Sequence, residues 1–240
     1  MKQFKAIFGI DADEVRKACV LMPFINKNTL KEFKIKHFTR GKLYEAGNSR
    51  DFTLIHSGIG SGLTGDAVLY LADNGCKNII LFGSCGLLES RKVNLDIGSL
   101  VSPKKSYSCE SFSRMLHNID IPPEVYSPDK ELLENFLEFG KRENVPEVTS
   151  ATIASLKLEE ERAAYFSQKG IEVIDMECSA FFAAADYAKI KALAFFYVSD
   201  IINKKPFYKN LALSDSYKLS ASIKRAICLL CSFIQENLSA

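Results

Sequence analysis

The chain has 240 residues, of which 47% are hydrophobic, and its formal net charge is only +2. This size and composition suit one large α/β domain over residues 1–240, and the mixed charges leave no basic surface for nucleic acid or a membrane. The N-terminal apolar run is too short for a signal peptide, and no stretch reaches membrane-spanning length, so we expect a cytoplasmic protein.

The seven cysteines are an odd number and are scattered through apolar segments. This pattern is typical of reduced, buried thiols rather than of a disulfide framework. Cys228 and Cys231 form a close pair, but they lie in an apolar C-terminal stretch with no second pair nearby. We therefore expect them to pack in the core and predict no metal site.

The N-terminal region is expected to begin with a strand followed by a helix. Residues 4–10 form an apolar run, and apolar residues at helical spacing follow over residues 15–21 until Pro23. Acids at Asp13 and Glu14 suit the first turn of such a helix because its dipole favours negative charge there.

Antiparallel strands are expected next. Residues 33–38 alternate apolar and polar side chains, as a half-exposed strand does. A turn at Gly47 and Asn48 separates two further strand-like runs, residues 42–46 and 52–57. Antiparallel strands entering an α/β chain predict a mixed sheet.

Gly58 to Gly62 follows a strand and precedes a predicted helix over residues 63–74. Glycines there let a ligand approach the backbone, and the N–H groups at a helix start attract oxyanions. A dinucleotide site would need an acid at the end of the next strand, residues 78–82, but Gly83 to Gly86 follows instead. The serine of that predicted turn, Ser84, can offer a hydroxyl, or it can simply cap the turn.

The remaining elements alternate between strands and helices. Residues 104–128 are loop-like, and a long loop inside a compact domain is often a binding loop. Ser127 is the predicted cap of the helix that follows that loop. Strands are expected at 97–102, 145–152 and 192–198, and helices at 129–140, 158–169, 178–189 and 212–238.

Two carboxylates follow apolar strands in the last third of the chain. Glu177 comes just after Val173 and Ile174, and Asp200 comes just after the run 192–198. We expect these strands to be neighbouring and parallel, which places both acids at the sheet edge where α/β folds bind ligands. The alternative is that each acid only caps a helix or lies in a loop.

The order of the motifs carries a family resemblance. It comprises Gly9 with Asp13-Glu14, Ser57-Gly-Ile-Gly60, Gly83-Ser-Cys-Gly86, Asp96-Ile-Gly98, Asp175-Met-Glu177 and Ser199-Asp200. Together they resemble the nucleoside phosphorylase superfamily, which includes purine nucleoside and uridine phosphorylases, methylthioadenosine/S-adenosylhomocysteine nucleosidases and futalosine hydrolase. The resemblance implies a three-layer α/β/α sandwich with a mixed, partly barrel-like central sheet. It also implies a homo-oligomer, a dimer or higher, that cleaves the bond between a ribose and a nitrogen base without a cofactor.

The resemblance also implies roles for individual residues. Asp200 matches the general acid that protonates the leaving purine, and Glu177 matches the carboxylate that binds the ribose hydroxyls. Met176 matches the residue that packs on the sugar. The other predicted substrate contacts are Ser84, Gly58, Ile59, Gly60 and Ser199.

The nucleophile divides hydrolases from phosphorylases in this family. Leu81 stands where the phosphorylases have an arginine, and an apolar side chain cannot hold an oxyanion. Glu14 aligns with the glutamate that activates water in the nucleosidases, so hydrolysis of a purine nucleoside is favoured. In the phosphorylase alternative, inorganic phosphate is a co-substrate, and Arg16 or Arg40 would bind it, the latter in a neighbouring subunit. A non-catalytic nucleoside-binding protein and a dinucleotide enzyme remain further alternatives.

Overall fold

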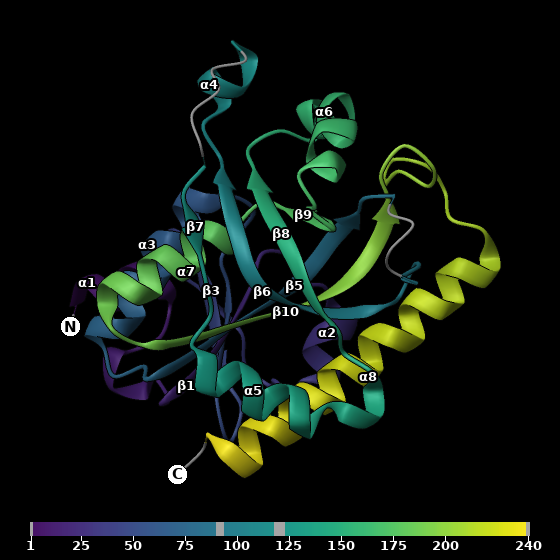
Figure 1. Ribbon diagram of the computed structural model, residues 1–240. Coiled ribbons are helices and arrows are strands. Elements are labelled where there is room, and N and C mark those ends of the chain that lie inside the picture. Colours follow the sequence, from purple (N-terminus) through teal and green to yellow (C-terminus); the bar gives the residue numbers. More distant parts are fainter. Residues whose placement is uncertain (1, 90–93, 118–122, 239–240) are drawn as a thin grey trace.

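The computed structural model describes residues 2–89, 94–117 and 123–238, and a mixed sheet forms its centre (Figure 1). The order of the sheet is β10-β6-β8-β9-β5-β1-β4-β3-β2, with β7 paired to β6. Because β10 also pairs with β5, the strands β5, β10, β6, β8 and β9 close into a ring. The expected mixed, partly barrel-like sheet is thus confirmed. The strands are β1 Ala18–Met22, β2 Thr39–Arg40, β3 Glu45–Asn48, β4 Thr53–His56, β5 Asn78–Leu87, β6 Leu100–Cys109, β7 Val125–Tyr126, β8 Glu147–Ile153, β9 Val173–Asp175 and β10 Lys191–Ile201.

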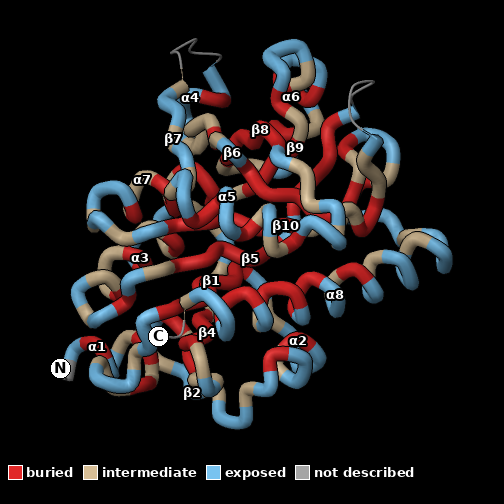
Figure 2. The backbone as a smooth tube through the Cα atoms, turned by 60° about the horizontal axis from the view of Figure 1, so that its bottom comes forward, coloured by how far each residue is buried: buried red, intermediate tan, exposed pale blue. Residues whose placement is uncertain are grey.

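Helices cover both faces of the sheet and complete the three layers. One face packs against α1, α3 and α7, and the other against α2, α5 and α8, while α6 and α4 share a third apolar cluster with β8 and β9. Figure 2 shows the buried residues concentrated in the strands and on the inner sides of these helices. The helices are α1 Lys2–Phe8, α2 Lys27–Glu32, α3 Ser61–Asp73, α4 Phe112–Leu116, α5 Lys130–Phe139, α6 Leu156–Gln168, α7 Cys178–Ala188 and α8 Leu213–Asn237, and the short 3-10 turns are η1 Ala12–Glu14 and η2 Lys141–Glu143.

The N-terminal prediction is wrong in both elements. Residues 4–10, expected as a strand, belong mostly to α1, where Phe4 and Phe8 lie one turn apart and stack with ring centroids at 4.4 Å. The expected helix over residues 15–21 contains β1, whose five residues are all buried. β1 lies between β4 and β5, a fully covered position that requires an unbroken apolar run.

Two predicted turns and one predicted strand also differ. Residues 33–38 form no strand, because α2 ends at Glu32 and the chain reaches β2 only at Thr39. The hairpin of β3 and β4 is confirmed, but Gly47 and Asn48 belong to β3. The turn expected at residues 83–86 is the continuation of β5, which pairs with β10 over its whole length.

The second half of the chain follows the sequence prediction closely. β8, α6, α7 and α8 lie where the pattern places them, and β6 extends beyond Pro103 into the expected loop. Asp129, not Ser127, caps α5, since its side chain accepts a hydrogen bond from Leu132 N at 2.8 Å. Part of the expected loop, residues 118–122, lies outside the described residues. Within the described ranges, none of the helices has the length and apolar character needed to cross a bilayer.

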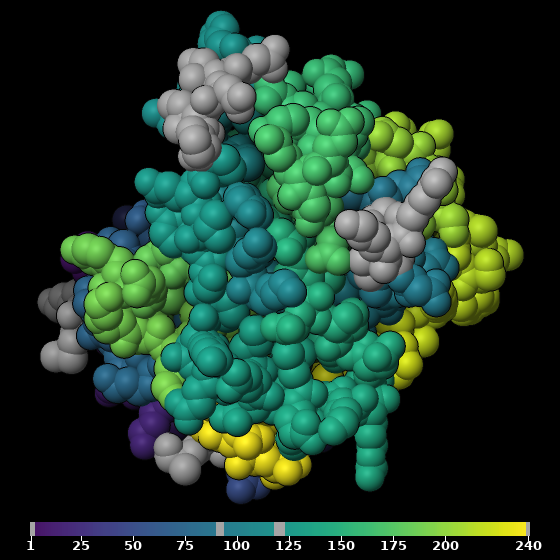
Figure 3. All heavy atoms as spheres, in the orientation of Figure 1, coloured from purple at the N-terminus to yellow at the C-terminus, as the bar shows by residue number. Residues whose placement is uncertain are grey.

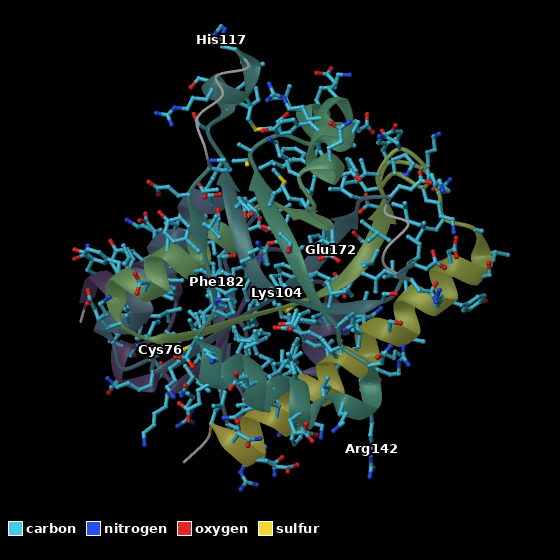
Figure 4. The ribbon with its side chains drawn as sticks, viewed as in Figure 1. Cys76, Lys104, His117, Arg142, Glu172 and Phe182 are labelled. Carbon is cyan, nitrogen blue, oxygen red and sulfur yellow. The ribbon has the colours of Figure 1, made fainter. Side chains whose placement is uncertain are left out.

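Side-chain positions agree with this layering. Figure 4 shows Phe182 of α7 and Cys76 in the interior, whereas His117 and Arg142 lie at the periphery of the molecule. Phe182 is only 1% exposed and Cys76 is fully buried. All seven cysteines are free thiols. Six of them are buried or half-buried in the core clusters or against them, including Cys231, whereas Cys228 is exposed. The interpretation of the cysteines as packing residues therefore holds for these six, but it is wrong for Cys228, which α8 presents to solvent.

Candidate active site

The predicted acids meet around the second half of β5. Asp200 of β10 pairs with Gly86 of β5, and on the other side of β5 Gly86 pairs with Ile174 of β9. β9 runs antiparallel to β5, whereas β10 runs parallel to it. The expectation of two neighbouring parallel strands is therefore wrong, but the two acids still flank the same segment of β5.

Solvent reaches this segment of the sheet at Ser84. In β5, Ser84 is exposed, although the residues on both sides of it are buried. The predicted contact Ser84 is therefore accessible to solvent on β5. The neighbouring hydroxyl of Tyr197, in register with Ser84 on β10, also interacts with the serine side chain.

Asp200 is a buried carboxyl with one hydrogen-bond partner. Its exposed fraction is 7%, and Ser199 Oγ donates to Asp200 Oδ1 at 2.7 Å. Burial raises the pKa of Asp200 above its ordinary value, and the Ser199 hydroxyl opposes the rise. A raised pKa means that the carboxyl keeps its proton to a higher pH than usual, which suits a group that acts as an acid.

Glu177 precedes α7 and contacts the glycine-rich loop. The Gly60 N–H donates to Glu177 Oε1 at 2.8 Å, and Ser61 Oγ donates to the carbonyl of Met176 at 3.0 Å. These two bonds join the start of α3 to the start of α7. Burial raises the pKa of Glu177 to about 8, with a further contribution from Asp175, while the Gly60 N–H lowers it.

The loop that contacts Glu177 has the backbone conformation that glycine allows. Gly58 and Gly60 have φ angles of 75° and 115°, which L-residues rarely adopt. Between them, Ile59 is 58% exposed. The structure thus brings Gly58, Ile59, Gly60 and Met176 to the same region as Glu177, as the sequence predicted, while their contacts with a nucleoside stay a prediction.

Asp175 holds the segment that carries Glu177. Its Oδ1 accepts hydrogen bonds from Glu177 N at 2.9 Å, from Cys178 N at 2.6 Å and from Thr152 Oγ1 at 2.8 Å. Burial raises the pKa of Asp175 to about 6, against the effect of these donors. The sequence analysis named Asp175 only as part of a motif, but the structure makes it the residue that orients the start of α7.

Glu159 is a fourth buried acid that the sequence analysis missed. It lies in the first turn of α6, is 7% exposed, and a Cβ at Gly86 would stand only 2.7 Å from its Oε1. The acidic run 159–161 is typical of the solvent-exposed face of a helix. The available signal was helical spacing, since Glu159 shares its face with the buried Ala163 and Phe166.

The buried charges of the protein are concentrated here and share one sign. Among the described residues, the buried carboxylic acids are Glu159, Asp175, Glu177 and Asp200, with no buried lysine, arginine or histidine. None of the ion pairs found in the described ranges includes one of these acids. The described part also holds no group of three or more histidine, cysteine or acidic side chains arranged for a metal ion.

Three predicted residues lie elsewhere. Glu14 and Arg16 precede β1, whose first residue pairs with the first residue of β5, so both lie at the opposite end of the sheet from Asp200. Glu14 Oε2 accepts a bond from Asp11 N at 2.7 Å. Arg40 lies on the outermost strand β2, with an 85% exposed side chain near Glu45. Within this chain, the structure does not bring these three residues to the acids.

The residues that follow β1 do lie close to the site, but none of them up to Asn26 is an acid. Pro23, which follows β1, would touch a Cβ at Gly83 at 3.5 Å, and the next residues are Phe24, Ile25 and Asn26. The alignment that placed Glu14 beside the site rested on a first strand at residues 4–10. Because the first strand is β1, that alignment is shifted along the chain.

Comparisons with known proteins agree with this fold. The family model of the phosphorylase superfamily matches residues 6–232. Among solved structures, a uridine phosphorylase from Vibrio fischeri has a TM-score of 0.73 at 16% identity, covering 95% of both chains. A 5'-methylthioadenosine/S-adenosyl homocysteine nucleosidase from Campylobacter jejuni has a TM-score of 0.72 at 15% identity, covering 92% of this chain and 99% of that one.

An AMP nucleosidase from Bacteroides thetaiotaomicron is also similar, with a TM-score of 0.69 at 16% identity over 96% of this chain and 95% of that one. A search of the curated proteins finds no match. At these identities, the structural likeness concerns the fold, and the similar structures include both hydrolases and phosphorylases.

Proposed function

The chain belongs to the phosphorylase superfamily. From this membership, and from a cluster of buried acids with no buried cation among the described residues, we propose that it is an N-ribosyl hydrolase acting on a purine-type nucleoside. Asp200 gives its proton to the leaving base, water attacks the anomeric carbon, and the proton that water loses passes through solvent and restores the Asp200 carboxyl. The products are the free base and the free sugar. The enzyme acts on a small molecule and needs no cofactor for this reaction.

The charge of the site is the observation that carries the choice of water. Phosphate is an anion at neutral pH, and a protein binds it with guanidinium, ammonium or several convergent N–H groups. Here Leu81, at the position that would supply an arginine, is fully buried in the apolar core. The candidate cations Arg16 and Arg40 lie away from the acids. Desolvating phosphate beside four acids without a cation is costly, whereas water makes no such demand.

Asp200 is the general acid in this proposal. Glycoside cleavage passes through an oxocarbenium-like transition state, and the departing purine needs a proton on its ring nitrogen. Burial keeps the Asp200 carboxyl protonated at a higher pH than usual, so it has a proton to give. Its Ser199 partner fixes the orientation of the carboxyl through the 2.7 Å hydrogen bond.

Glu177 binds the ribose. One of its oxygens is oriented by the Gly60 N–H, which leaves the other to contact the sugar hydroxyls. Asp175 supports this geometry because it accepts the Glu177 N–H and so fixes the turn that presents the carboxyl. Each hydrogen bond to the sugar contributes roughly 0.5–1.5 kcal/mol, and removing the Glu177 carboxyl would also leave buried hydroxyls unpaired at a cost of about 1–3 kcal/mol.

The test is release of purine base by the purified protein in phosphate-free buffer, followed by chromatography. We expect base and free ribose as products, a change of less than about twofold on adding phosphate, and no ribose 1-phosphate. Asp200→Asn is the matched control, since it should lose turnover of at least about 10²-fold under both conditions. Strict dependence on phosphate, with ribose 1-phosphate as the product, would overturn the hydrolase and favour a phosphorylase.

A further inference from the structure

The residue at the start of α7 does not cap its own helix. Glu177 occupies the N-cap position, where Ser, Thr, Asp or Asn side chains usually bind the first N–H groups, but its side chain caps none of them. The Glu177 carboxyl accepts from the Gly60 N–H instead. Because buried N–H groups without partners are costly, the first N–H groups of α7 need acceptors from elsewhere.

Two side chains of the sheet supply these acceptors. Asp175 Oδ1 accepts from the N–H groups of Glu177 and Cys178, and Thr152 Oγ1 accepts from Ser179 N at 2.8 Å. Thr152 and Asp175 are directly paired on β8 and β9, so their side chains project to the same side of the sheet. Figures 1 and 3 show α7, in light green, on the outside of the molecule beside β6 and β7. Capping by the sheet leaves the Glu177 carboxyl available to the glycine-rich loop and to a ligand.

The hydroxyl of Thr152 uses its full hydrogen-bonding capacity. A hydroxyl donates one hydrogen and accepts up to two. The Thr152 hydrogen goes to Asp175 Oδ1 at 2.8 Å, and one acceptor position is taken by Ser179 N. Ser106 Oγ, at 3.2 Å, is therefore the donor to the second acceptor position. Thr152 is fully buried, so this one hydroxyl on β8 joins β6, β9 and the first turn of α7 without competition from water.

Ser150 is a second buried hydroxyl on the same strand, and it holds nothing in place. It lies two residues before Thr152, so it projects to the same side of β8, and it is also fully buried. Its Oγ has no hydrogen-bond partner among the described residues, and neither has Asp175 Oδ2. Burial raises the pKa of Asp175 to about 6, and of the groups that oppose this rise Ser150 has the smallest effect. Ser150 thus lies near Asp175, but the Thr152 hydroxyl is the one bonded to it.

We propose that Thr152 is a positioning residue for ribose recognition, because its hydroxyl fixes Asp175 and the first turn of α7 and thereby the direction of Glu177. This inference rests on the proposed function, in which Glu177 binds the sugar hydroxyls. Without the Thr152 hydroxyl, Ser179 N loses its acceptor and Asp175 Oδ1 loses one of its three donors. The turn that presents Glu177 then relaxes, and its bonds to the 2′- and 3′-hydroxyls of the ribose weaken. The preference for a riboside over a 2′-deoxyriboside reports this change.

The experiment measures kcat/KM of the full-length protein for adenosine or inosine, whichever wild type cleaves faster, and for the matching 2′-deoxynucleoside. Both values come from one preparation, so a loss of folded protein cancels in their ratio. Thr152→Val keeps the shape without the hydroxyl and should lower the riboside preference at least about fivefold. Thr152→Ser keeps the hydroxyl and should stay within about twofold of wild type. Thr152→Cys retains only a weak donor and acceptor, so its preference should fall between these two.

Ser150→Ala is the matched control, since it removes the neighbouring buried hydroxyl that has no hydrogen-bond partner, and it should keep the wild-type preference. A wild-type preference in Thr152→Val would overturn this inference and leave the proposed function standing; if that variant does not fold, the same result in Thr152→Cys decides. An equal loss in Ser150→Ala, or a wild-type enzyme that does not prefer ribosides, would also overturn it. Failure of wild type to release base from either nucleoside would overturn the proposed function as well, so the two failures are distinguishable.

Discussion

Raising the pH from 5 to 8.5 is expected to destabilise the folded protein, because its buried acids keep their protons above the pH at which the unfolded chain loses them. Glu177 illustrates the size of the effect. Its pKa rises from the ordinary value of 4.5 to about 8 on folding, chiefly through burial. At about 1.36 kcal/mol per pKa unit, its ionisation at high pH costs the folded state up to roughly 5 kcal/mol.

The sign follows from proton binding in the two states. Between pH 4.5 and about 8, folded Glu177 and Glu159 retain a proton that the unfolded chain has released, so stability falls as the pH rises through this window. Asp175 adds to the loss from pH 3.8 to about 6. The costs are not additive because the acids repel one another. Ligand-free protein should still lose several kcal/mol over the range, roughly half of a typical domain's stability.

The assay is urea unfolding at pH 5 and pH 8.5 for wild type, Glu177→Gln and the exposed control Glu161→Gln. Glu177→Gln should stabilise the protein at pH 8.5 by about 1–3 kcal/mol and should change it little at pH 5, because the amide carries no charge to bury. Glu161→Gln should follow wild type at both pH values. A wild-type stability that is constant or rises between pH 5 and 8.5 would refute the reasoning.

Three further predictions concern activity. Asp200→Asn keeps the shape of the side chain but has no proton to give, so turnover on a purine nucleoside should fall at least about 10²-fold while binding, measured by calorimetry, persists. Glu177→Ala should lose about 2–4 kcal/mol in kcat/KM and the preference for ribosides over 2′-deoxyribosides; an unchanged preference would assign the 2′-hydroxyl to another residue. Glu14→Gln should retain wild-type turnover, because the structure places Glu14 at the far end of the sheet; a loss of tenfold or more would contradict that placement.

The family resemblance and the second half of the fold could be predicted from the sequence because their signals are local. Ala-rich α7 and the apolar run of β10 have distinct lengths and periods, and Asp200 and Glu177 follow apolar segments that can be recognised without tertiary information. The direction of β9 relative to β5 was not predictable in this way. Three residues of strand carry no signal for their partner, which depends on how the ring of strands closes.

The N-terminal error has a similar physical origin. The run over residues 4–10 is apolar enough for a short buried strand or for a helix, and only the spacing of Phe4 and Phe8 favours the helix. If residues 4–10 are taken as the first strand, the alignment with the family motifs is displaced along the chain and puts Glu14 at the site. Glu159 was missed for the opposite reason: its neighbours in sequence are charged, and burial comes from α6 packing over Gly86.

Hydrolases and phosphorylases share this fold, so the fold does not choose the nucleophile. The choice depends on whether the acids that meet the sugar and the base are accompanied by a cation. Among the described residues of this chain, no buried cation accompanies these acids. Burial raises the pKa values of all four acids. A phosphate dianion would be desolvated there without a cation to compensate, whereas a neutral nucleoside supplies hydroxyl donors to Glu177 and an acceptor to the Asp200 carboxyl. The same unpaired acids that reduce the stability of the free protein at high pH therefore favour a neutral substrate and a neutral nucleophile.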